Sequence, residues 1–239
     1  MAADTDKREG RVQRRRTRTR AALLDAAEQA FTRDGYHGVT MESLAAEADV
    51  SVGSIYQHFT NKDGLYLKVA ERATDLFAGY LEQAYAASES PLEQVMACGH
   101  AYLLFHLEHP GAFRLIAFDG VESRAPAGGE AAHREATART AAVIARFRDC
   151  IAAAVASGEA GPHVDPELTA RVLFGAWNGI VGLGLRHDEL RQDDDAITAC
   201  VEQMRQIVLN GLVDPGYRDV GGSARAALLT IESPQNDDD

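Results

Sequence analysis

Apolar residues recur every three or four positions along most of the chain, and no segment shows the strict alternation expected of a β-strand. Leu24, Ala27 and Phe31 form such a stripe on a helix expected from Arg18 to Asp34. Gly35 follows directly, at the position of a glycine that ends a helix. The periodicity therefore predicts an all-α fold.

Helix-start signals divide the rest of the chain. Thr40, Ser51 and Asn61 each precede an apolar stripe and are predicted to cap a helix. Ser90-Pro91 and Asp165-Pro166 pair a capping residue with a proline at the first helical position. Residues between these signals are predicted to form short helices over about 41–48 and 52–58, and further helices over about 62–86, 91–108, 111–118, 131–157, 166–187 and 194–212.

Charge is distributed unevenly along the chain. The formal net charge is −12, but residues 1–20 carry +5 and the remainder carries −17. Residues 1–16 are polar, charged and without periodicity, so they are expected to form a disordered basic arm. An acidic body would repel phosphates elsewhere and favour one docking face for nucleic acid. The alternative is a solvated tail that binds nothing.

The remaining composition argues against several classes of protein. No apolar run reaches the ~18 residues that suggest a membrane span, and the charged start lacks the apolar core of a secretory signal. Cys98, Cys150 and Cys200 are widely separated and odd in number, which favours free thiols packed in helices over disulfides or a reactive redox thiol. We therefore expect a cytoplasmic protein without a membrane partner.

The two short helices within residues 40–62 have the chemistry of a helix-turn-helix whose second helix enters DNA. Gly53 lacks a side chain where the backbone would approach phosphates or bases. Ser51 and Ser54 can donate hydrogen bonds to phosphates, and Gln57 can read adenine in the major groove. This segment predicts binding to double-stranded DNA.

Neighbouring side chains divide between contact and packing roles. Tyr56 and Lys62 are placed for phosphate oxygens, whereas Ile55 and Phe59 face the opposite way and hold the unit together. A purely structural role, covering the junction with the next helix, stays open for both Tyr56 and His58.

The run from Arg18 to about Ala73 resembles the N-terminal domain of TetR-family transcriptional regulators. The matching elements are Ala26-Ala27, Phe31, Gly35-Tyr36, Val39-Thr40, Leu44-Ala45, Ala48-x-Val50-Ser51-x-Gly53-Ser54-Ile55-Tyr56-x-His58-Phe59 and Lys62-Asp63-Gly64-Leu65. The resemblance implies DNA contacts at Thr40, Ser51, Ser54, Tyr56, His58 and Lys62. Val52 departs from the family, in which many members have lysine or arginine, so one phosphate contact is in doubt. The full predicted DNA-binding set is Thr40, Ser51, Val52, Gly53, Ser54, Tyr56, Gln57, His58 and Lys62.

In that family a variable helical C-terminal domain binds a small molecule and dimerises through its last two long helices. Here these would be residues 166–187 and 194–212. The first is nearly apolar all round, as expected of a helix buried on more than one side. The predicted interface residues are Leu173, Gly175, Gly179, Gly182, Ile197, Val201, Met204 and Val208. The run Trp177-Asn178-Gly179 also resembles the Trp-His-Gly element of one TetR C-terminal subgroup, with asparagine replacing histidine.

Polar side chains on otherwise apolar faces indicate a candidate ligand pocket. The candidates are Phe77, Tyr80, Met96, His100, Leu103, Leu104, Phe113, Phe118, Phe147, Phe174, Trp177 and Asn178. For any one of them core packing is the simpler role, but the resemblance implies that some together line a cavity. His100, His106 and His109 lack the spacing and partner ligands of a metal site, so no metal or other cofactor is expected.

The expected organisation is a basic arm (1–16), a DNA-binding domain (17–77) with its helix-turn-helix at 41–60, a ligand-binding and dimerisation domain (78–215) and a disordered tail (216–239). The predicted function is sequence-specific regulation of transcription, as a homodimeric repressor that a small hydrophobic or aromatic ligand releases from a palindromic operator. Two alternatives stay open. One is a DNA-binding or architectural protein without a ligand. The other is an all-helical enzyme, although the sequence contains no nucleophile–base pair, phosphate-binding loop or set of metal ligands that would support it.

Overall fold

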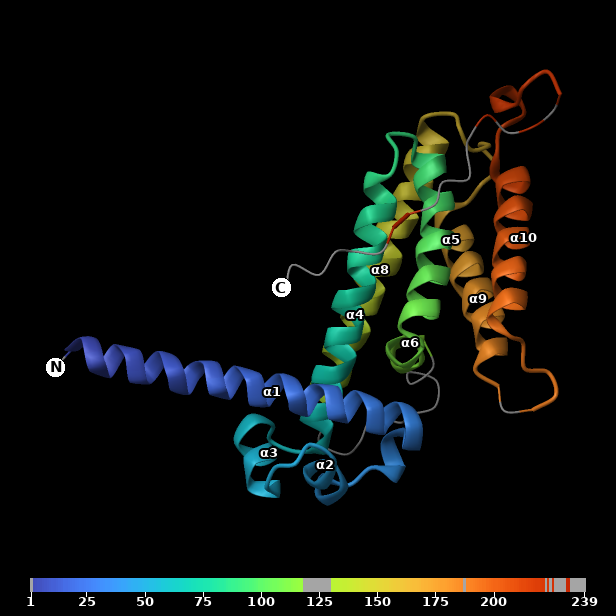
Figure 1. Cartoon of the computed structure of the whole chain (residues 1–239). Coiled ribbons are helices and arrows are strands. Elements are labelled where there is room, and N and C mark those ends of the chain that lie inside the picture. The colour runs from blue at the N-terminus through green and yellow to red at the C-terminus, as the bar shows by residue number, and fades with distance from the viewer. Residues whose placement is uncertain are drawn as a thin grey trace. The chain divides into compact units, whose positions relative to one another are not determined.

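The computed structural model describes residues 2–117, 130–186, 188–221, 223, 225 and 231–232 (Figure 1). Within these ranges the regular structure is helical, so the all-α prediction is confirmed. The elements are α1 (Ala2–Gly38), α2 (Met41–Glu47), α3 (Val52–His58), α4 (Lys62–Ala86), α5 (Pro91–Glu108), α6 (Pro110–Ala117), α8 (Glu130–Ala156), α9 (Pro166–Gly184), α10 (Asp194–Leu212) and the 3₁₀ helix η1 (Pro215–Tyr217).

The chain folds into two compact units. The first unit comprises Met1–Ala73 and Arg114–Ala136, and the second comprises Thr74–Phe113 and Thr137–Asp239, each as far as its residues are described. One boundary falls inside α4, which continues unbroken from the first unit into the second. α4 therefore contributes residues to both units.

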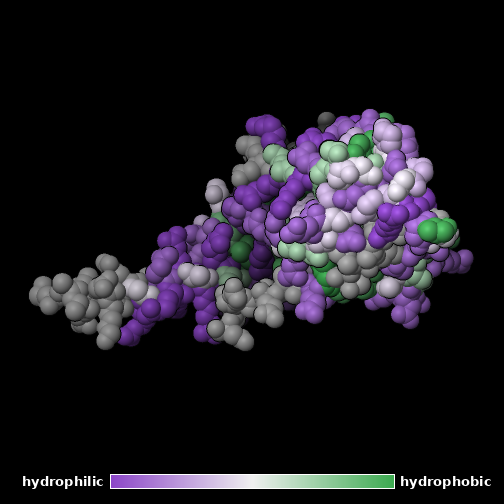
Figure 2. Space-filling model, turned by 90° about the horizontal axis from the view of Figure 1, so that it is seen from above, coloured by the Kyte–Doolittle hydropathy of each residue, from purple (hydrophilic) through white to green (hydrophobic). Residues whose placement is uncertain are grey.

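The first helix is longer than the sequence predicted. α1 starts at Ala2 instead of Arg18, so residues 2–16, expected to be disordered, are helical. Residues 11–16 contain neither glycine nor proline and are rich in arginine and glutamine, which are good helix formers. This local propensity explains the correction. The described side chains over residues 13–18 are exposed, and this stretch is hydrophilic in Figure 2.

α1 is interrupted at Gly35, where the sequence predicted a helix end. Gly35 has φ 68° and ψ 171°, a conformation that is essentially restricted to glycine. The break turns the chain so that the ring of Tyr36 lies 6.2 Å from that of Phe31 and 5.1 Å from that of Tyr66. The glycine thus lets an aromatic cluster close the end of α1 against α4.

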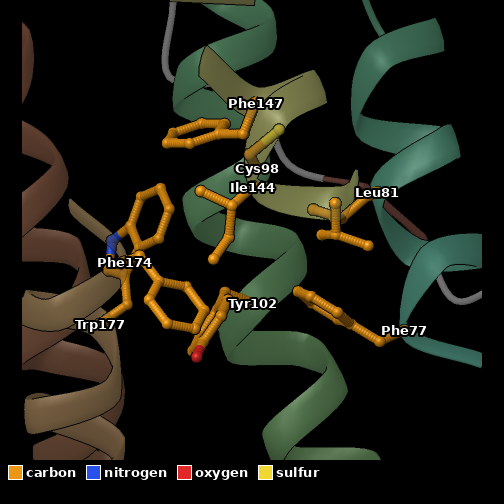
Figure 3. Close-up of a pocket in the computed structure, with 9 residues that line it drawn as sticks. Phe77, Leu81, Cys98, Tyr102, Ile144, Phe147, Phe174 and Trp177 are labelled. Atoms are coloured by element: carbon orange, nitrogen blue, oxygen red, sulfur yellow. The ribbon is translucent and has the colours of Figure 1, made fainter. Parts of the chain in front are cut away.

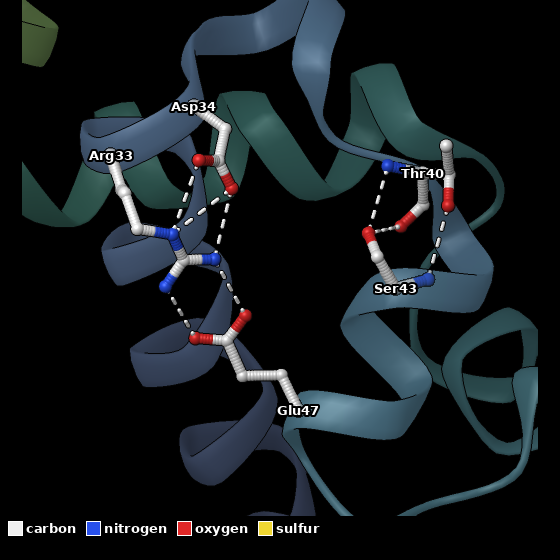
Figure 4. A network of polar contacts seen from close by, with 5 residues as sticks. All are labelled: Arg33, Asp34, Thr40, Ser43 and Glu47. Atoms are coloured by element: carbon white, nitrogen blue, oxygen red, sulfur yellow. Dashed lines mark hydrogen bonds and ion pairs between the residues drawn. The ribbon is translucent and has the colours of Figure 1, made fainter.

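Local capping fixes both ends of the segment between α1 and α3. Thr40 Oγ1 accepts from the Ser43 N–H and Ser43 Oγ accepts from the Thr40 N–H, each at 3.0 Å, which forms a reciprocal cap on α2 (Figure 4). Ser51 Oγ accepts from the Ser54 N–H at 3.1 Å and caps α3. Asp49, in the turn between them, has a left-handed backbone with φ 51°. The predicted caps at Thr40 and Ser51 are confirmed.

The Asp49 turn leads to a stability prediction. Left-handed backbone is free of cost for glycine, tolerable for aspartate and asparagine, and unfavourable for β-branched residues. We expect Asp49→Val to lower the free energy of unfolding by about 1–2 kcal/mol, whereas Asp49→Asn should leave it nearly unchanged. Urea unfolding followed by circular dichroism measures both. Equal stability of the two variants would contradict this reading of the turn.

A hydrophobic core holds α2 and α3 against α1 and the start of α4. Leu23, Phe31, Leu44, Ile55 and Leu65 are each at most 2% exposed. On the surface, Arg33 on α1 donates through both Nη atoms to Glu47 on α2, at 3.2 and 3.0 Å (Figure 4). Since Ile55 is the fully buried residue of α3, the opposite face of that helix is left outside the core.

In the second unit, α5, α9 and α10 are packed most closely. α5 is buried along most of its length. A methyl group at Gly99 of α5 would lie 3.1 Å from Trp177 Cζ2 on α9 and 3.2 Å from Arg205 Cγ on α10. Arg205 is buried, and its Nε donates to the Met96 carbonyl at 3.1 Å while its Nη1 pairs with Glu202 at 2.7 Å. These contacts tie three helices into one rigid layer.

The region expected to be a disordered tail is partly ordered. η1 extends into this region as far as Tyr217, shortly after the isolated bridge between Val213 and Ala160 in the preceding domain. The Arg225 N–H donates to the Tyr217 carbonyl at 3.1 Å, and the Ile231 N–H donates to His100 Nδ1 at 3.2 Å. Backbone hydrogen bonds to the body, which periodicity does not reveal, explain this difference from the prediction.

Candidate nucleic-acid interface and ligand cavity

The outer face of α3 is open to solvent and carries groups suited to DNA. Tyr56 is 52% exposed, and Ser51, Gly53 and Gln57 are also exposed. A methyl group at Gly53 would meet only Ser51 Oγ, at 3.9 Å, so the folded protein itself does not require glycine there. The close approach of a binding partner to the backbone would explain why this position is a glycine.

The side-chain hydroxyl groups of Thr40 and Ser51, which cap α2 and α3, can each still donate a hydrogen bond to a ligand. Thr40 Oγ1 and Ser51 Oγ each accept from a backbone N–H, and a hydroxyl that accepts can still donate its own hydrogen. Ser54 is half-buried and Thr40 is exposed. The predicted contact residues Thr40 and Ser51 therefore cap α2 and α3 and still have a hydroxyl hydrogen to donate.

Lys62 is held in place by an aromatic ring. Its Nζ lies 4.3 Å from the centroid of the Tyr36 ring, a cation–π distance. Tyr36 OH in turn donates to Asp63, and burial together with that bond raises the pKa of Tyr36 to about 12. Partial burial lowers the pKa of Lys62, opposed by Asp63. The sequence did not predict this contact between Lys62 and Tyr36 or the hydrogen bond from Tyr36 to Asp63.

Arginines of α1 lie beside the end of α3. The guanidinium carbon of Arg20 is 5.6 Å from the centroid of the Phe59 ring. Burial, and then the positive charges of Arg16 and Arg20, lower the pKa of His58. Arg16, which the sequence assigned to a separate arm, thus contributes with Arg20 to the electrostatic environment of His58 on α3. Val52 is half-buried against the core, which fits its departure from the basic residue of many family members.

His58 gives a prediction about pH. In the free protein its pKa lies below the ordinary value of about 6.5. A nearby phosphate would raise that pKa, so DNA binding would take up a proton, and affinity for DNA should rise as pH falls from 7.5 towards 6. His58→Asn should remove this part of the dependence. Titrations monitored by fluorescence anisotropy at fixed salt would measure it. An equal pH slope in both proteins would place His58 away from DNA.

A small apolar cavity lies in the second unit. Nine residues from four helices line it: Phe77 and Leu81 of α4, Cys98 and Tyr102 of α5, Val143, Ile144 and Phe147 of α8, and Phe174 and Trp177 of α9 (Figure 3). Its free volume is about 30 Å³. None of these side chains is charged. Burial raises the pKa of the Cys98 thiol far above its ordinary range, so this thiol is a packing group and not a nucleophile.

The cavity includes some of the predicted pocket residues. Phe77, Phe147, Phe174 and Trp177 line it. Asn178 is adjacent, since it accepts a hydrogen bond from Tyr102 OH. Sequence reasoning missed the lining residues Leu81, Cys98, Tyr102, Val143 and Ile144, although their apolar spacing on predicted helices was visible.

Other predicted pocket residues lie elsewhere in the core. Tyr80 OH donates a hydrogen bond to Glu108. The ring centroid of Phe113 lies 5.2 Å from the ring centroids of both Tyr102 and His106. His100 binds the backbone of Ile231. Met96, Leu103 and Leu104 also stand outside the lining of this cavity, and Phe118 lies outside the described residues. Helical periodicity identified buried faces but not which buried position borders empty space.

The predicted dimer residues lie partly in the core of a single chain and partly on its surface. Leu173, Ile197, Val201 and Val208 are at most 9% exposed within one chain, because the more apolar stripes of α9 and α10 cover α5 and each other. Gly175 and Gly179 are exposed, whereas Gly182 and Met204 are half-buried. The apolar side chains left exposed on these helices include Leu168, Val172 and Ile207, at 58%, 64% and 60%.

No helix among the described residues is long and apolar enough to cross a membrane. No three histidine, cysteine or carboxylate side chains in that part of the chain gather as a metal site would require. All three cysteines are free; Cys98 and Cys150 are buried, and Cys200 is exposed on α10.

Residues 23–69 match the family described as bacterial regulatory proteins, tetR family, and residues 95–207 match the family described as tetracyclin repressor-like, C-terminal domain. The transcriptional regulator RutR of Escherichia coli K12 is 25% identical over 225 residues, which cover 89% of this chain and 99% of RutR. The transcriptional activator FasR of Mycolicibacterium smegmatis is 35% identical over 102 residues, covering 42% of this chain and 46% of FasR.

Solved structures share the fold. A TetR regulator from Chloroflexus aurantiacus superposes with a TM-score of 0.72 at 18% identity, covering 84% of this chain and 98% of that chain. AibR, in complex with isovaleryl coenzyme A and operator DNA, has a TM-score of 0.63 at 20% identity, with 79% and 97% covered. The named relatives regulate transcription and are not enzymes. With an N-terminal and a C-terminal family match that follow each other along the chain, this protein belongs to the TetR family of DNA-binding transcriptional regulators.

Proposed function

We propose that the protein is a homodimeric repressor that binds a palindromic operator in the cytoplasm and is released by a small hydrophobic or aromatic ligand. The observation that carries the DNA part is the exposed face of α3, where Gly53 is open and Arg16 and Arg20 influence His58. A pair of such helices, roughly 34–36 Å apart in a dimer, would enter successive major grooves.

The ligand part rests on the cavity of the second unit. Its lining is aromatic and uncharged, which suits an apolar ligand and penalises a charged one. Support by analogy comes from AibR, whose structure holds isovaleryl coenzyme A and operator DNA. A ketosteroid regulator of Mycobacterium tuberculosis, with a TM-score of 0.63, shares the fold. The isovaleryl group is a small branched hydrocarbon and a ketosteroid is largely hydrocarbon, whereas the coenzyme A part of the first ligand is anionic and would have to remain outside an uncharged lining.

The dimer would use the exposed stripe on α9 together with α10. Leu168, Val172, Gly175 and Gly179 follow one another at spacings of four, three and four residues, and nothing lies within 4 Å of a methyl group at either glycine. Exposed apolar side chains in such a row suit burial against a second copy. Since Cys200 is the exposed cysteine, a bismaleimide should cross-link two chains through it. Gly175→Arg should prevent this cross-linking. If the parent protein is a monomer in solution, the proposed dimer is refuted.

Gly53 gives a prediction that separates DNA binding from folding. Alanine at this exposed helical position should raise the free energy of unfolding by about 0.5–1 kcal/mol, because alanine is the better helix former. If α3 approaches DNA closely, the same methyl group should weaken operator binding at least about tenfold, a cost of about 1.4 kcal/mol. Thermal unfolding and anisotropy titrations test the two effects. Unchanged DNA affinity would place Gly53 away from the groove.

The central experiment is selection of bound DNA from a random pool, followed by a screen for small molecules that release the selected operator. Gln57→Ala should then relax preference at one base position, whereas Tyr56→Phe should weaken binding to all sequences. Equal affinity for selected and random DNA would refute a specific regulator.

The second candidate is a DNA-binding protein that needs no ligand. The small free volume of the cavity favours it, since about 30 Å³ is far below the ~150 Å³ of an apolar cavity that binds benzene. A crystal structure from the ligand screen decides between the two functions. A ligand within the cavity supports release by effector, and failure of every compound to displace a specific operator supports the ligand-free function.

A further inference from the structure

The cavity has one rigid wall. Trp177 and Phe174 of α9 face Tyr102 of α5, and the indole of Trp177 packs directly over Gly99 (Figure 3). These two helices belong to the closely packed layer with α10. Tyr102 is further fixed by the bond from its hydroxyl to Asn178. A ligand cannot push this wall back without disrupting the core of the unit.

The other wall is held by two ion pairs at the surface. Asp75 Oδ1 of α4 lies 3.2 Å from Arg139 Nη1 of α8, and Glu82 of α4 pairs with Arg146 of α8. We call these two pairs the α4–α8 latch. The acids are seven residues apart on α4 and the arginines seven apart on α8, so the pairs are two helical turns apart on both helices.

The latch brackets the cavity wall. Phe77 and Leu81 lie between the two acids in the sequence of α4, and Val143 and Ile144 lie between the two arginines in α8; all four line the cavity. Arg146 makes a second contact to α4, because its guanidinium carbon is 4.3 Å from the centroid of the Tyr85 ring. The α4–α8 latch therefore has more contacts at the Glu82–Arg146 pair than at the Asp75–Arg139 pair.

The free volume requires this wall to move. An apolar cavity that accepts benzene measures about 150 Å³, whereas this one offers about 30 Å³. Since the wall of α5 and α9 is rigid, the additional volume has to come from separating α4 and α8. Only apolar, uncharged groups would be stable between them, because the lining has no charge to pair with an ion.

We propose that the cavity admits an uncharged aromatic or branched hydrocarbon group by opening between α4 and α8, and that the α4–α8 latch sets the cost of this opening. The proposal rests on the ligand-binding function proposed above and assigns its regulation to four residues outside the cavity.

The test uses N-phenyl-1-naphthylamine, an uncharged aromatic probe that fluoresces in apolar sites, with the full-length protein. Arg139→Gln with Arg146→Gln should bind the probe about four- to twenty-fivefold more tightly, because each surface pair contributes a factor of about two to five. Arg148→Gln is the matched control. Arg148 also lies on α8 but pairs with Asp149 and with Glu167 of α9, so its loss should leave probe affinity unchanged.

Salt and charge reversal give independent readouts. The latch side chains are largely exposed, so raising the salt concentration should screen the pairs and tighten probe binding in the parent protein but not in the double variant. Asp75→Arg and Arg139→Asp should each tighten probe binding, and combining them should restore the parent affinity. Restoration distinguishes an ion pair from general loosening of the fold, which circular dichroism would also detect.

Each outcome has a definite meaning. Ile144→Trp, which fills the cavity, should abolish probe binding. If it does so while the latch variants keep the parent affinity, the cavity is a ligand site but the latch proposal is wrong. If the parent protein binds no probe, opening to an uncharged aromatic group is refuted together with the ligand half of the proposed function. A separate measurement of operator affinity tests the proposed DNA binding independently of ligand binding.

Discussion

Deleting residues 2–16 is expected to weaken operator binding roughly a thousandfold at 0.1 M salt and to flatten its dependence on salt. This segment holds six basic and three acidic side chains, and its described arginines are exposed on the first half of α1. If the two copies in a dimer contact four phosphates in total, the slope of log K against log salt should fall by about 3.6. Filter binding or anisotropy across a salt series measures both quantities.

The control for this deletion keeps the helix and changes only its charge. Replacing Arg11, Arg14 and Arg15 by glutamine, which has similar helix propensity, should reproduce most of the loss in slope. Unfolding by urea should be nearly unchanged in both variants, because residues 13–16 bury no surface in the core. An unchanged salt slope with normal operator affinity would show that this part of α1 binds no phosphate.

Short-range signals predicted the helices well because they depend on neighbouring residues. Ser90 Oγ accepts from the Glu93 N–H, Asp165 Oδ1 from the Leu168 N–H, and Asn61 Oδ1 from the Gly64 N–H, as the sequence indicated. The α3 surface was predictable for the same reason. Its buried residue Ile55 and its exposed residues alternate with helical period within one short element.

The cavity was harder to predict, because it depends on packing between distant segments. Phe77 and Tyr80 are three residues apart on α4, and both are buried. Phe77 borders the cavity, whereas the hydroxyl of Tyr80 reaches Glu108 on α5. A helical wheel places both on one face. Only the position of α5 and α8 decides which of them borders free space.

The predicted dimer residues are divided between buried and exposed positions for a related reason. A helix that is apolar on several sides gives no indication of which stripe faces its own chain. In α9, Leu173 and Trp177 are buried within the chain, whereas Leu168 and Val172 are exposed. Arg205 of α10 was not predicted to be buried, yet it lies in the core, where its Nε donates to the Met96 carbonyl.

Replacing Trp177 by alanine should lower the free energy of unfolding by about 3–5 kcal/mol. The indole is 4% exposed, its ring centroid lies 5.3 Å from that of Phe147 and 5.6 Å from that of Tyr102, and it closes the space over Gly99. Alanine would leave a large void between helices that are otherwise rigid. Urea unfolding must be followed by circular dichroism, because Trp177 is the chain's single tryptophan and fluorescence would be lost.

Trp177→Phe is the informative control, because the indole nitrogen is buried without a hydrogen-bond partner. Phenylalanine removes that unsatisfied N–H, a group that costs about 1–3 kcal/mol when buried unpaired, and keeps most of the ring. The gain and the lost contact area act in opposite directions, so this variant should lie within about 1.5 kcal/mol of the parent protein. If phenylalanine were as damaging as alanine, the N–H would have a partner and Trp177 would act through a hydrogen bond. A loss below about 1 kcal/mol for alanine would instead show that α9 and α5 yield easily, and the rigid wall required for opening between α4 and α8 would not exist.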